Sequence, residues 1–224
     1  MPRSRPPLSR DRVLSAAVTY ADEHGLDALS MRGLADLLGV VPMALYKHVA
    51  NKDALLDGMV DVIVGEIDPP QATADWRPAV RARILSARAA LVRHPWAADL
   101  FRTRTSASPV VLGYMDSLMG MFRAGGFSDA LTHHVMHALS TRMWGLTLDV
   151  FPTPPPPPDE VTARAMMTEL ATRYPNILAI ASAAGHDPDG RAVGGGCDDQ
   201  AEFEFALDVL LDGFARRLAA QQVR

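Results

Sequence analysis

The sequence predicts an all-α protein with an N-terminal three-helix domain, built around a helix-turn-helix, and a larger C-terminal helical domain. Apolar residues recur every three or four positions along most of the 224 residues, which is the pattern of amphipathic helices. Ser, Asn, Gly and Pro stand where these patterns begin and end, as helix caps do. No segment of useful length alternates apolar and polar residues as a strand does. We place the two domains at residues 1–67 and 68–224.

The first helix is expected from about Ser9 to His24, after a basic, Pro-rich arm over residues 1–8. The side chains expected on its inner face are Val13, Leu14, Ala17 and Tyr20. Gly25 then ends the helix, because glycine adopts the unusual backbone of a helix end at little cost.

A helix-turn-helix follows at residues 30–48. Ser30 can cap a helix that runs through Leu38, and Gly39 supplies the turn. The next helix, Pro42 to His48, begins with a proline, whose missing N–H is not needed there. The apolar face of the first of these helices consists of Leu34, Leu37 and Leu38. Two helices joined by a tight Gly turn place the second one in a DNA major groove.

A longer helix closes the N-terminal domain. Asn51 can cap it, and we expect it from Lys52 to about Ile67, where Asp68-Pro69-Pro70 stops it. This helix leads out of the first domain, so it is the physical link to the second.

The C-terminal domain is expected to hold seven helices. Their ranges are Arg77–Arg93, Pro95–Arg102, Pro109–Ala124, Ser128–Val150, Glu160–Tyr174, Asn176–Ala184 and Ala201–Gln221. A polyproline stretch near residues 152–158 and a Gly-rich loop at 185–200 separate the later ones. The last helix is more apolar than a solvated terminal helix, with Phe203, Phe205, Leu207, Leu210, Leu211, Phe214 and Leu218.

The segment Val13 to Met59 resembles the DNA-binding domain of tetracycline-repressor-family (TetR) regulators. The matching residues are Gly25, Leu29-Ser30, Leu34-Ala35, Leu38-Gly39-Val40, Leu45-Tyr46, His48-Val49, Asn51-Lys52 and Leu55-Leu56. Further along, His94-Pro95-Trp96 is similar to the ligand domain of the tetracycline repressors themselves. The resemblance implies a regulator that binds double-stranded DNA at an operator, responds to a small-molecule effector and acts as a homodimer.

Candidate DNA-binding residues lie in and around the second helix of the helix-turn-helix. They are Ser30, Arg32, Met43, Tyr46, Lys47, His48 and Lys52. In the family the hydroxyl at the position of Tyr46 commonly meets a phosphate, and Lys52 lies at a helix N-terminus, where phosphates bind well. Val41, Pro42 and Met43 depart from the family, which often has polar residues there. Apolar side chains read a thymine methyl or nothing, so shape readout and the arginines of the arm are expected to contribute more.

Candidate ligand-binding residues lie in the C-terminal domain. They are His94, Met115, Met119, Phe122, His133, His137, Trp144 and Met166. Most of the eleven methionines lie between Met115 and Met167, and methionine is frequent where a pocket adapts to varied ligands, although ordinary core is the default interpretation. The residues at 133, 137, 141, 144 and 148 share one helical stripe, which suggests a cavity-facing side with a histidine as its polar anchor.

Two other functions stay open at this point. A metal-dependent enzyme could use His133 and His137, which stand at i and i+4, although no third ligand at a suitable spacing completes a zinc site. A structural DNA-binding protein without an effector would have a filled interior, and the Met-rich middle argues mildly against that. The residues predict no catalytic group, no metal and no cofactor.

Charge is unevenly distributed along the chain. The formal net charge is −4, but residues 1–52 hold seven basic and five acidic residues, a net charge of +2. A basic head on an acidic body fits a DNA-binding end and a separate regulatory body. No uncharged apolar run is long enough for a membrane span, the N-terminus lacks a secretion signal, and the single Cys197 suits a reducing cytoplasm.

The combined prediction is a cytoplasmic, ligand-responsive transcriptional repressor that binds a near-palindromic operator as a homodimer. The ligand-binding and dimerisation domain would dimerise through the 128–150 and 201–221 helices of each subunit as a four-helix bundle. A small, largely apolar effector would bind between residues 76 and 174 and shift the 52–67 helix, releasing the operator.

Overall fold

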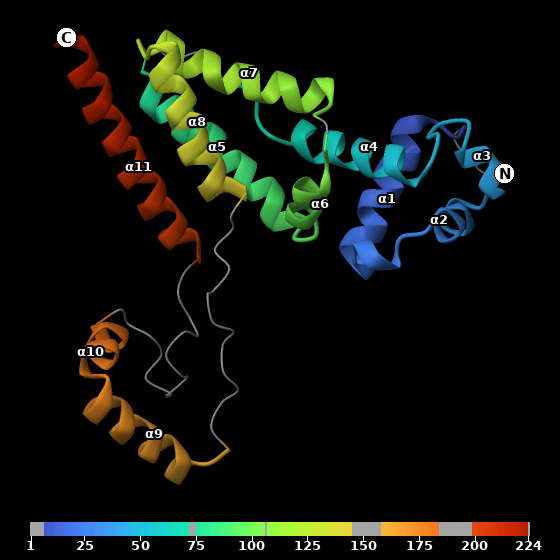
Figure 1. The fold of residues 1–224 in the computed structure, drawn as a ribbon. Helices are drawn as coiled ribbons and strands as arrows, with labels where there is room; N and C mark the ends of the chain where they lie inside the picture. Colours follow the sequence, from blue (N-terminus) through green and yellow to red (C-terminus); the bar gives the residue numbers. More distant parts are fainter. Residues whose placement is uncertain (1–6, 72–74, 106, 145–157, 184–198, 224) are drawn as a thin grey trace. The chain divides into compact units, whose positions relative to one another are not determined.

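The computed structural model describes residues 7–71, 75–105, 107–144, 158–183 and 199–223, and these are helical, with no strand among them (Figure 1). The helices are α1 (Arg10–His24), η1 (Leu26–Ala28), α2 (Met31–Leu38), α3 (Pro42–Leu45), α4 (Lys52–Gly65), α5 (Trp76–Arg93), α6 (Ala97–Thr103), α7 (Pro109–Ala124), α8 (Asp129–Trp144), α9 (Glu160–Arg173), α10 (Pro175–Ala183) and α11 (Asp199–Gln222). The all-α prediction is confirmed. Residues 1–144 with 210–224 form one compact unit, and residues 145–209 form a second.

Side-chain caps begin the first helices, at the predicted caps Ser30 and Asn51 and also at Ser9, which precedes α1. Ser9 accepts a hydrogen bond from the amide of Arg12 at 3.2 Å, and Ser30 accepts one from Gly33 at 3.1 Å. Asn51 Oδ1 accepts one from the amide of Ala54 at 2.8 Å. Each bond satisfies a backbone donor that the first turn of a helix leaves unpaired, so these three starts follow from local chemistry.

The core of the N-terminal helices lies between α1 and α4. Leu14 and Ala17 of α1 and Leu55 of α4 are almost fully buried. Gly58 permits the close approach, since an ideal Cβ built there would lie 2.5 Å from Leu14 Cδ2. Tyr20, expected on the inner face of α1, is only half-buried and stacks on the ring of His24 at 4.5 Å.

The helix-turn-helix forms with two differences from the expectation. Gly39 adopts the left-handed backbone that joins α2 to α3, with φ of 67° and ψ of 40°. Leu37 was expected on the apolar face, but 57% of it is exposed, whereas Leu34 and Leu38 are buried. The second helix is also shorter than expected, because α3 ends at Leu45 and residues 46–48 form a turn.

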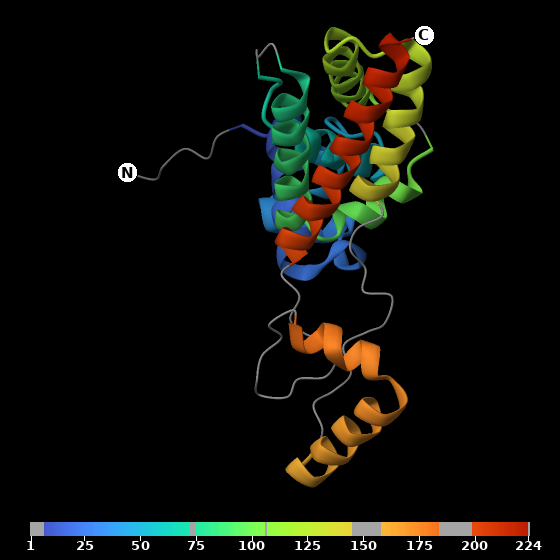
Figure 2. The same ribbon diagram turned by 90° about the vertical axis from the view of Figure 1, so that its left-hand side faces the viewer.

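Helices α5, α7 and α8 and the C-terminal half of α11 build the larger core (Figure 2). Phe122 of α7 is fully buried and contacts Trp76, Phe127 and Phe214, with ring centroids 5.7, 5.2 and 6.2 Å away. Arg77 of α5 forms an ion pair with Asp212 of α11. Tilted and edge-on rings of this kind pack favourably, so an aromatic cluster ties the end of α11 to α5 and α7.

Other helix bounds differ from the expected ones by a few residues. α6 begins at Ala97 because Pro95 and Trp96 form a turn after His94, and α4 ends at Gly65 rather than Ile67. The expected helix over residues 128–150 is described as α8 up to Trp144, and residues 145–150 lie outside the described residues. In the second unit, α9 and α10 contact each other, and α9 has no buried residue. No helix among the described residues is long and apolar enough to cross a membrane.

Candidate nucleic-acid interface and effector cavity

Helix α3 and the turn after it present an exposed set of side chains. We call the exposed residues Arg32, Val41, Met43, Tyr46, Lys47 and Lys52 the reading surface. Val41 is 68% exposed and Met43 71%, while Leu45 beside them is fully buried and anchors α3. An exposed helix anchored by one buried leucine is suited to enter a groove of DNA.

The predicted DNA-binding residues divide into three kinds by their surroundings. Met43, Tyr46, Lys47, Lys52 and Arg32 are exposed, and Lys52 is the first residue of α4, at a helix N-terminus. The hydroxyl of Ser30 already caps α2, so its first role is structural. His48 is only half-buried and lies in the turn after α3. These positions support phosphate contacts around a central apolar patch of Val41 and Met43.

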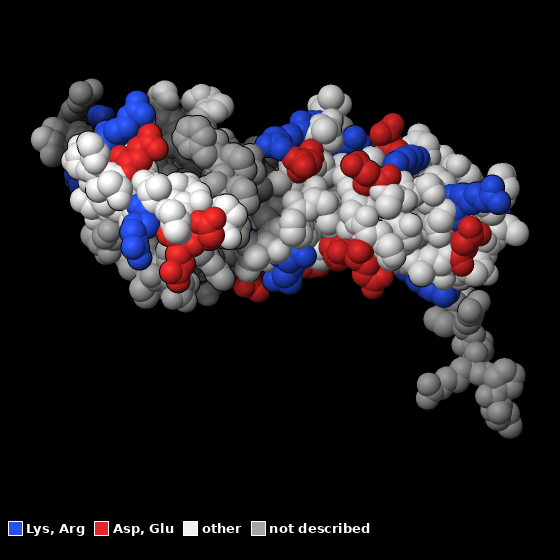
Figure 3. All heavy atoms as spheres, turned by 90° about the horizontal axis from the view of Figure 1, so that it is seen from below, with Lys and Arg blue, Asp and Glu red and all other residues white. Residues whose placement is uncertain are grey.

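On one face of the molecule (Figure 3), the charged side chains of the described residues do not gather into one basic field. On the face shown in Figure 3, Lys and Arg side chains are interspersed with Asp and Glu. The basic residues at positions 3 and 5 of the N-terminal arm lie outside the described residues. Within the reading surface, the positive charge comes from the single residues Arg32, Lys47 and Lys52.

The larger cavity lies between α7 and α8 and has a volume of about 620 Å³. Its apolar lining comes from Val64, Val111, Met115, Leu118, Met119, Met136 and Leu139. His133 and His137 of α8 lie at its wall with ring centroids 4.6 Å apart. A mostly apolar space with a few polar groups is the usual composition of a small-molecule site.

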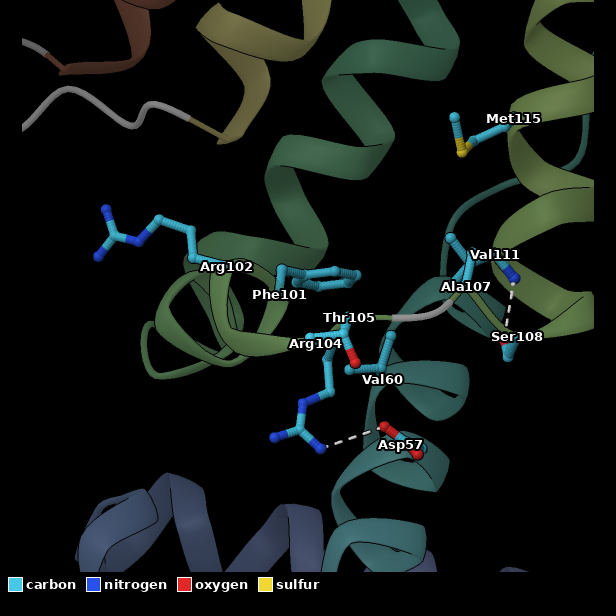
Figure 4. Close-up of a pocket in the computed structure, with 10 residues that line it drawn as sticks. All are labelled: Asp57, Val60, Phe101, Arg102, Arg104, Thr105, Ala107, Ser108, Val111 and Met115. Atoms are coloured by element: carbon cyan, nitrogen blue, oxygen red, sulfur yellow. Dashed lines mark hydrogen bonds and ion pairs between the residues drawn. The ribbon is translucent and has the colours of Figure 1, made fainter.

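A second cavity of about 480 Å³ lies where α4, α6 and α7 meet (Figure 4). Figure 4 shows Phe101 and Met115 pointing into it, and the guanidinium of Arg104 turned toward Asp57 of α4. Val111 and Met115 line both cavities. The two spaces are therefore neighbours that share one wall of α7.

Polar contacts connect the segment after α6 to α4. Arg104 donates to Asp57 at 3.2 Å and, more weakly, to Asp53 at 3.5 Å, and the hydroxyl of Ser108 donates to Asp61. All three carboxylates lie on α4, the helix that begins at the reading surface. Arg104 and Ser108, which line the smaller cavity, are therefore bonded directly to α4.

Buried polar groups lie close to the larger cavity. Burial raises the pKa of Tyr114 to about 12, although the nearby guanidinium of Arg83 acts in the opposite direction, 4.8 Å from the Tyr114 ring. Tyr114 therefore stays a neutral phenol at any physiological pH. Thr132 is also buried, and its hydroxyl has no hydrogen-bond partner in the described part of the chain.

The predicted ligand-binding residues do not all lie together. Met115, Met119, His133 and His137 line the larger cavity. Phe122 lines neither cavity, because it lies in the aromatic core. Met166 is on α9, in the second unit, where it is 43% exposed. The side chain of Trp144 lies outside the described residues.

His94, predicted to bind the ligand, lies instead where α1, α4 and α5 meet. Its Nδ1 is 2.7 Å from Asp22 Oδ1 of α1, and its Nε2 is 3.2 Å from Glu66 Oε2 at the end of α4. Trp96 donates to the same oxygen of Asp22 at 2.7 Å, and Arg93 donates to Glu66 at 2.7 Å. His94 lines neither cavity, so its surroundings are those of a junction between helices.

The carboxyl of Glu66 is held ionised at this junction. Burial acts to raise its pKa, but the hydrogen bonds and positive charges of Arg93 and His94 outweigh burial and lower it below the ordinary value. Arg104, Asp57 and Glu66 were not predictable as functional residues from the sequence. Only the structure brings these distant positions together, since they carry no local motif.

The described residues do not form a metal site. No group of three His, Cys, Asp or Glu side chains among them converges on one point. His133 and His137 are close, but Asp129, the nearest acidic residue on their helix face, is paired with Arg123 at 2.9 Å. The described geometry therefore gives the two histidines no third ligand.

Comparison with known proteins gives matches along almost the whole chain. Residues 13–59 match the family described as bacterial regulatory proteins, tetR family, and residues 68–218 match the tetracyclin repressor-like, C-terminal domain. A curated HTH-type transcriptional regulator from Saccharopolyspora erythraea is 39% identical over 129 residues, which is 57% of this chain. That match spans about half of the relative's own length, 55%.

Solved structures share the fold over nearly the full length. Apo ActR from Streptomyces coelicolor superposes with a TM-score of 0.74 at 28% identity, covering 97% of this chain and 100% of ActR. ActR in complex with actinorhodin gives 0.70 at 29% identity, over 95% and 99% of the two chains. Mycobacterium smegmatis BioQ with its double-stranded DNA operator gives 0.61 at 25% identity, over 94% and 99%.

Proposed function

Because this chain belongs to the TetR family of transcriptional regulators, we propose that it is a ligand-responsive repressor that binds a near-palindromic operator as a homodimer. The family match covers both the helix-turn-helix and the C-terminal domain. Its relatives are regulators and not enzymes. The comparisons give no support to a metal-dependent enzyme using His133 and His137, or to a structural DNA-binding protein without an effector. Acting on operator DNA, the protein would work in the cytoplasm.

The observation that carries the proposal is the position of α4. Its first residue, Lys52, belongs to the reading surface. Further along, Val60 lines the smaller cavity and Val64 the larger one. A molecule that occupies either cavity therefore contacts the helix whose N-terminus lies beside the DNA. Ligand and DNA would then oppose each other if each favours a different position of α4.

The effector we propose is a largely apolar or aromatic molecule with a few polar groups. The methionines and leucines of the larger cavity favour apolar surface that can adapt in shape. His133 or His137 would supply a polar anchor at the wall, and Arg104 a charged one at the neighbouring cavity. ActR has been solved with actinorhodin, which makes actinorhodin a reasonable first probe.

Dimerisation through α8 and α11 is part of the proposal. On α11, Phe205 is 69% exposed and Val209 is 51% exposed in the single chain. Two such helices from each subunit can form a four-helix bundle, and a two-fold dimer presents two reading surfaces to two half-sites. This symmetry is the reason to expect a near-palindromic operator.

The test begins by selecting bound sequences from random double-stranded DNA with the purified protein. A set of apolar and polycyclic aromatic compounds, actinorhodin among them, is then screened for thermal stabilisation and for release of the selected DNA. We expect a near-palindromic sequence, and at least one compound that both stabilises the protein and releases the DNA. Recovery of no preferred sequence, or stabilisation by compounds that never release DNA, would contradict the proposal.

A matched pair of variants on α7 connects release to the cavity. Val111→Trp places a large side chain in the wall shared by both cavities, while Val110, its neighbour, is 42% exposed and is not among the lining residues of either. Val111→Trp should still bind the operator but require at least tenfold more compound for release. Val110→Trp should behave as the wild type. Equal behaviour of both variants would place the ligand elsewhere.

A further inference from the structure

We infer that His94 is a positioning residue that holds α1 and α4 to the α5–α6 corner only while both of its ring nitrogens carry a proton. The role rests on its contacts with two different elements, Asp22 of α1 at 2.7 Å and Glu66 of α4 at 3.2 Å. The junction therefore weakens as the pH rises. This sensitivity would act on the helix that carries the reading surface.

The protonation state follows from the two partners. An ionised carboxylate only accepts hydrogen bonds, and a neutral imidazole has one donor nitrogen and one acceptor nitrogen. Since each ring nitrogen of His94 faces a carboxylate oxygen, a neutral ring can satisfy only one of them and would set a lone pair against the other. The doubly protonated ring donates to both.

The partners are themselves held as acceptors. Asp22 Oδ1 also accepts the indole N–H of Trp96 at 2.7 Å. Glu66 Oε2 accepts two bonds from Arg93, at 2.7 and 3.2 Å, and its pKa lies below the ordinary value. Both carboxylates already accept hydrogen bonds from other donors, so two simultaneous bonds to His94 require a donor at each of its ring nitrogens.

The charged groups around His94 come from each element packed on it. α1 contributes Asp22, the end of α4 contributes Glu66, and α5 contributes Arg93. The ring of Trp96 lies edge-on to His94 with centroids 6.0 Å apart. When His94 is charged, the two positive charges of His94 and Arg93 balance the two negative charges of Asp22 and Glu66. Loss of its proton leaves one uncompensated negative charge beside a side chain that is only 9% exposed.

The consequence for regulation rests on the proposed function, in which α4 transmits the ligand signal. Along α4, Asp57 is bound by Arg104, Asp61 by Ser108, and Glu66 by Arg93 and His94. Only the bond from His94 depends on a proton that a histidine in water loses near pH 6.5. At higher pH α4 would have one contact fewer in this arrangement, and the arrangement would be easier to displace.

The first experiment reads the ring directly, without DNA or ligand. Nitrogen-15 NMR of the histidine side chains distinguishes an imidazolium from either neutral tautomer, and His94→Gln assigns the signal. We expect the His94 ring of the wild-type protein to be imidazolium under conditions in which the ring of Glu66→Gln is neutral, because the amide of Gln can donate to a neutral ring. The same protonation state in both proteins at every pH measured would overturn the inference.

The second experiment measures affinity for the selected operator from pH 6.5 to 9 at constant salt. Wild-type affinity should fall by roughly tenfold or more, the effect of one lost hydrogen bond to a charged group. The operator affinity of Glu66→Gln should change by less than about twofold over the same pH range, apart from the change that the DNA contacts cause equally in both proteins. His48 belongs to the predicted DNA contacts and is present in both proteins, so its own titration cancels in the comparison. Parallel pH profiles would contradict the regulatory role.

The two readouts separate this inference from the proposed function. If no operator is found, the proposed function fails, and the NMR result still decides the state of His94. If the operator is bound but the two pH profiles are parallel, the repressor proposal stands and the pH-sensitive junction does not. Circular dichroism of Glu66→Gln confirms that the comparison is between folded proteins.

Discussion

At the scale of single residues, the reading surface has an unusual centre. Val41 and Met43 are the most exposed apolar residues of the helix-turn-helix, and neither can donate or accept a strong hydrogen bond. Around them, Tyr46, Lys47 and Lys52 are placed for phosphate contacts, which give affinity without sequence information. We therefore expect base recognition at the centre of this surface to depend on apolar contacts and on DNA shape, with Arg32 as the nearby side chain that can donate to a base edge.

A prediction follows for the bases that Met43 meets. Replacing thymine by deoxyuridine removes only the C5-methyl group, which is the apolar feature of the major groove. We expect at least one thymine per half-site at which this change weakens binding by about fourfold, the effect of one lost buried methyl group. In Met43→Ala or Val41→Ala the same substitution should have little effect. Titration of singly substituted operators measures this, and uniform insensitivity to deoxyuridine would exclude methyl readout.

At this scale, the role of a residue could be predicted from the sequence where its own side-chain chemistry determines that role. It could not be predicted where packing against distant residues determines it. Ser30 and Asn51 were identified as caps because their oxygens bond to nearby amides whatever the rest of the fold does. Leu37 fits the helical spacing of its neighbours, but it falls at the edge of the buried stripe and is exposed. Phe122 is predicted to line the ligand cavity from its apolar type, and His94 from the resemblance of His94-Pro95-Trp96 to the tetracycline repressors. Only the folded chain shows the aromatic cluster around one and the two carboxylates around the other.

At the scale of elements, the close contact of α1 and α4 explains a glycine in the middle of a helix. Gly58 would otherwise weaken α4, because glycine is a poor helix former. A methyl group there would meet both terminal carbons of Leu14, at 2.5 and 2.9 Å. The gain from helix propensity is therefore smaller than the cost of forcing these two helices apart.

Gly58→Ala should consequently destabilise the protein by about 1–3 kcal/mol. Gly113 provides the matched control, because it also lies inside a helix and an added Cβ would meet nothing within 4 Å. Gly113→Ala should be neutral or stabilise by up to about 1 kcal/mol. Urea unfolding of the two variants and the wild type decides the matter, and a stabilised Gly58→Ala would show that α1 and α4 are not packed as described.

The order of the helices was predictable, and their ends were less so. The predicted start of α7 at Pro109 is the observed one, since a proline at the first turn is a local signal, and the structure adds Ser108 as its cap. The end of α3 has no such signal, because Tyr46, Lys47 and His48 fit a helix as well as a turn. The two cavities could not have been drawn from the sequence, since their shared wall requires α4, α6, α7 and α8 to meet.

At the scale of the whole molecule, the protein should be a dimer in the absence of DNA. Sedimentation at micromolar concentration should give twice the 24.2 kDa chain mass. Phe205→Asp places a charge on the exposed apolar face of α11 and should shift the protein toward monomer, since an unpaired charge in an apolar interface is costly. Phe205→Leu is the control and should remain a dimer. A wild-type monomer would contradict the bundle.

The division into domains at residues 1–67 and 68–224 stays a prediction. The match to the N-terminal family ends at residue 59 and the match to the C-terminal family begins at residue 68, near the predicted boundary at 67. The compact units of the structure divide differently, with the N-terminal helices and α5 to α8 in one unit. The junction formed by Arg104, Ser108 and His94 with α4 gives a physical reason, because it joins the two predicted domains closely.

The length of α4 converts small movements into large ones. Its 14 residues extend about 21 Å at the usual rise per residue, from the Glu66 end to Lys52. A tilt of only about 5° around the Glu66 end would carry Lys52 sideways by roughly 2 Å, given that length. In a two-fold dimer the opposite movements add, so the distance between the two reading surfaces would change by up to about 4 Å. The helical repeat of DNA fixes the distance between the two half-sites. Because α4 is long, a small motion at the cavity is enough to make the distance between the two reading surfaces differ from the distance between the half-sites.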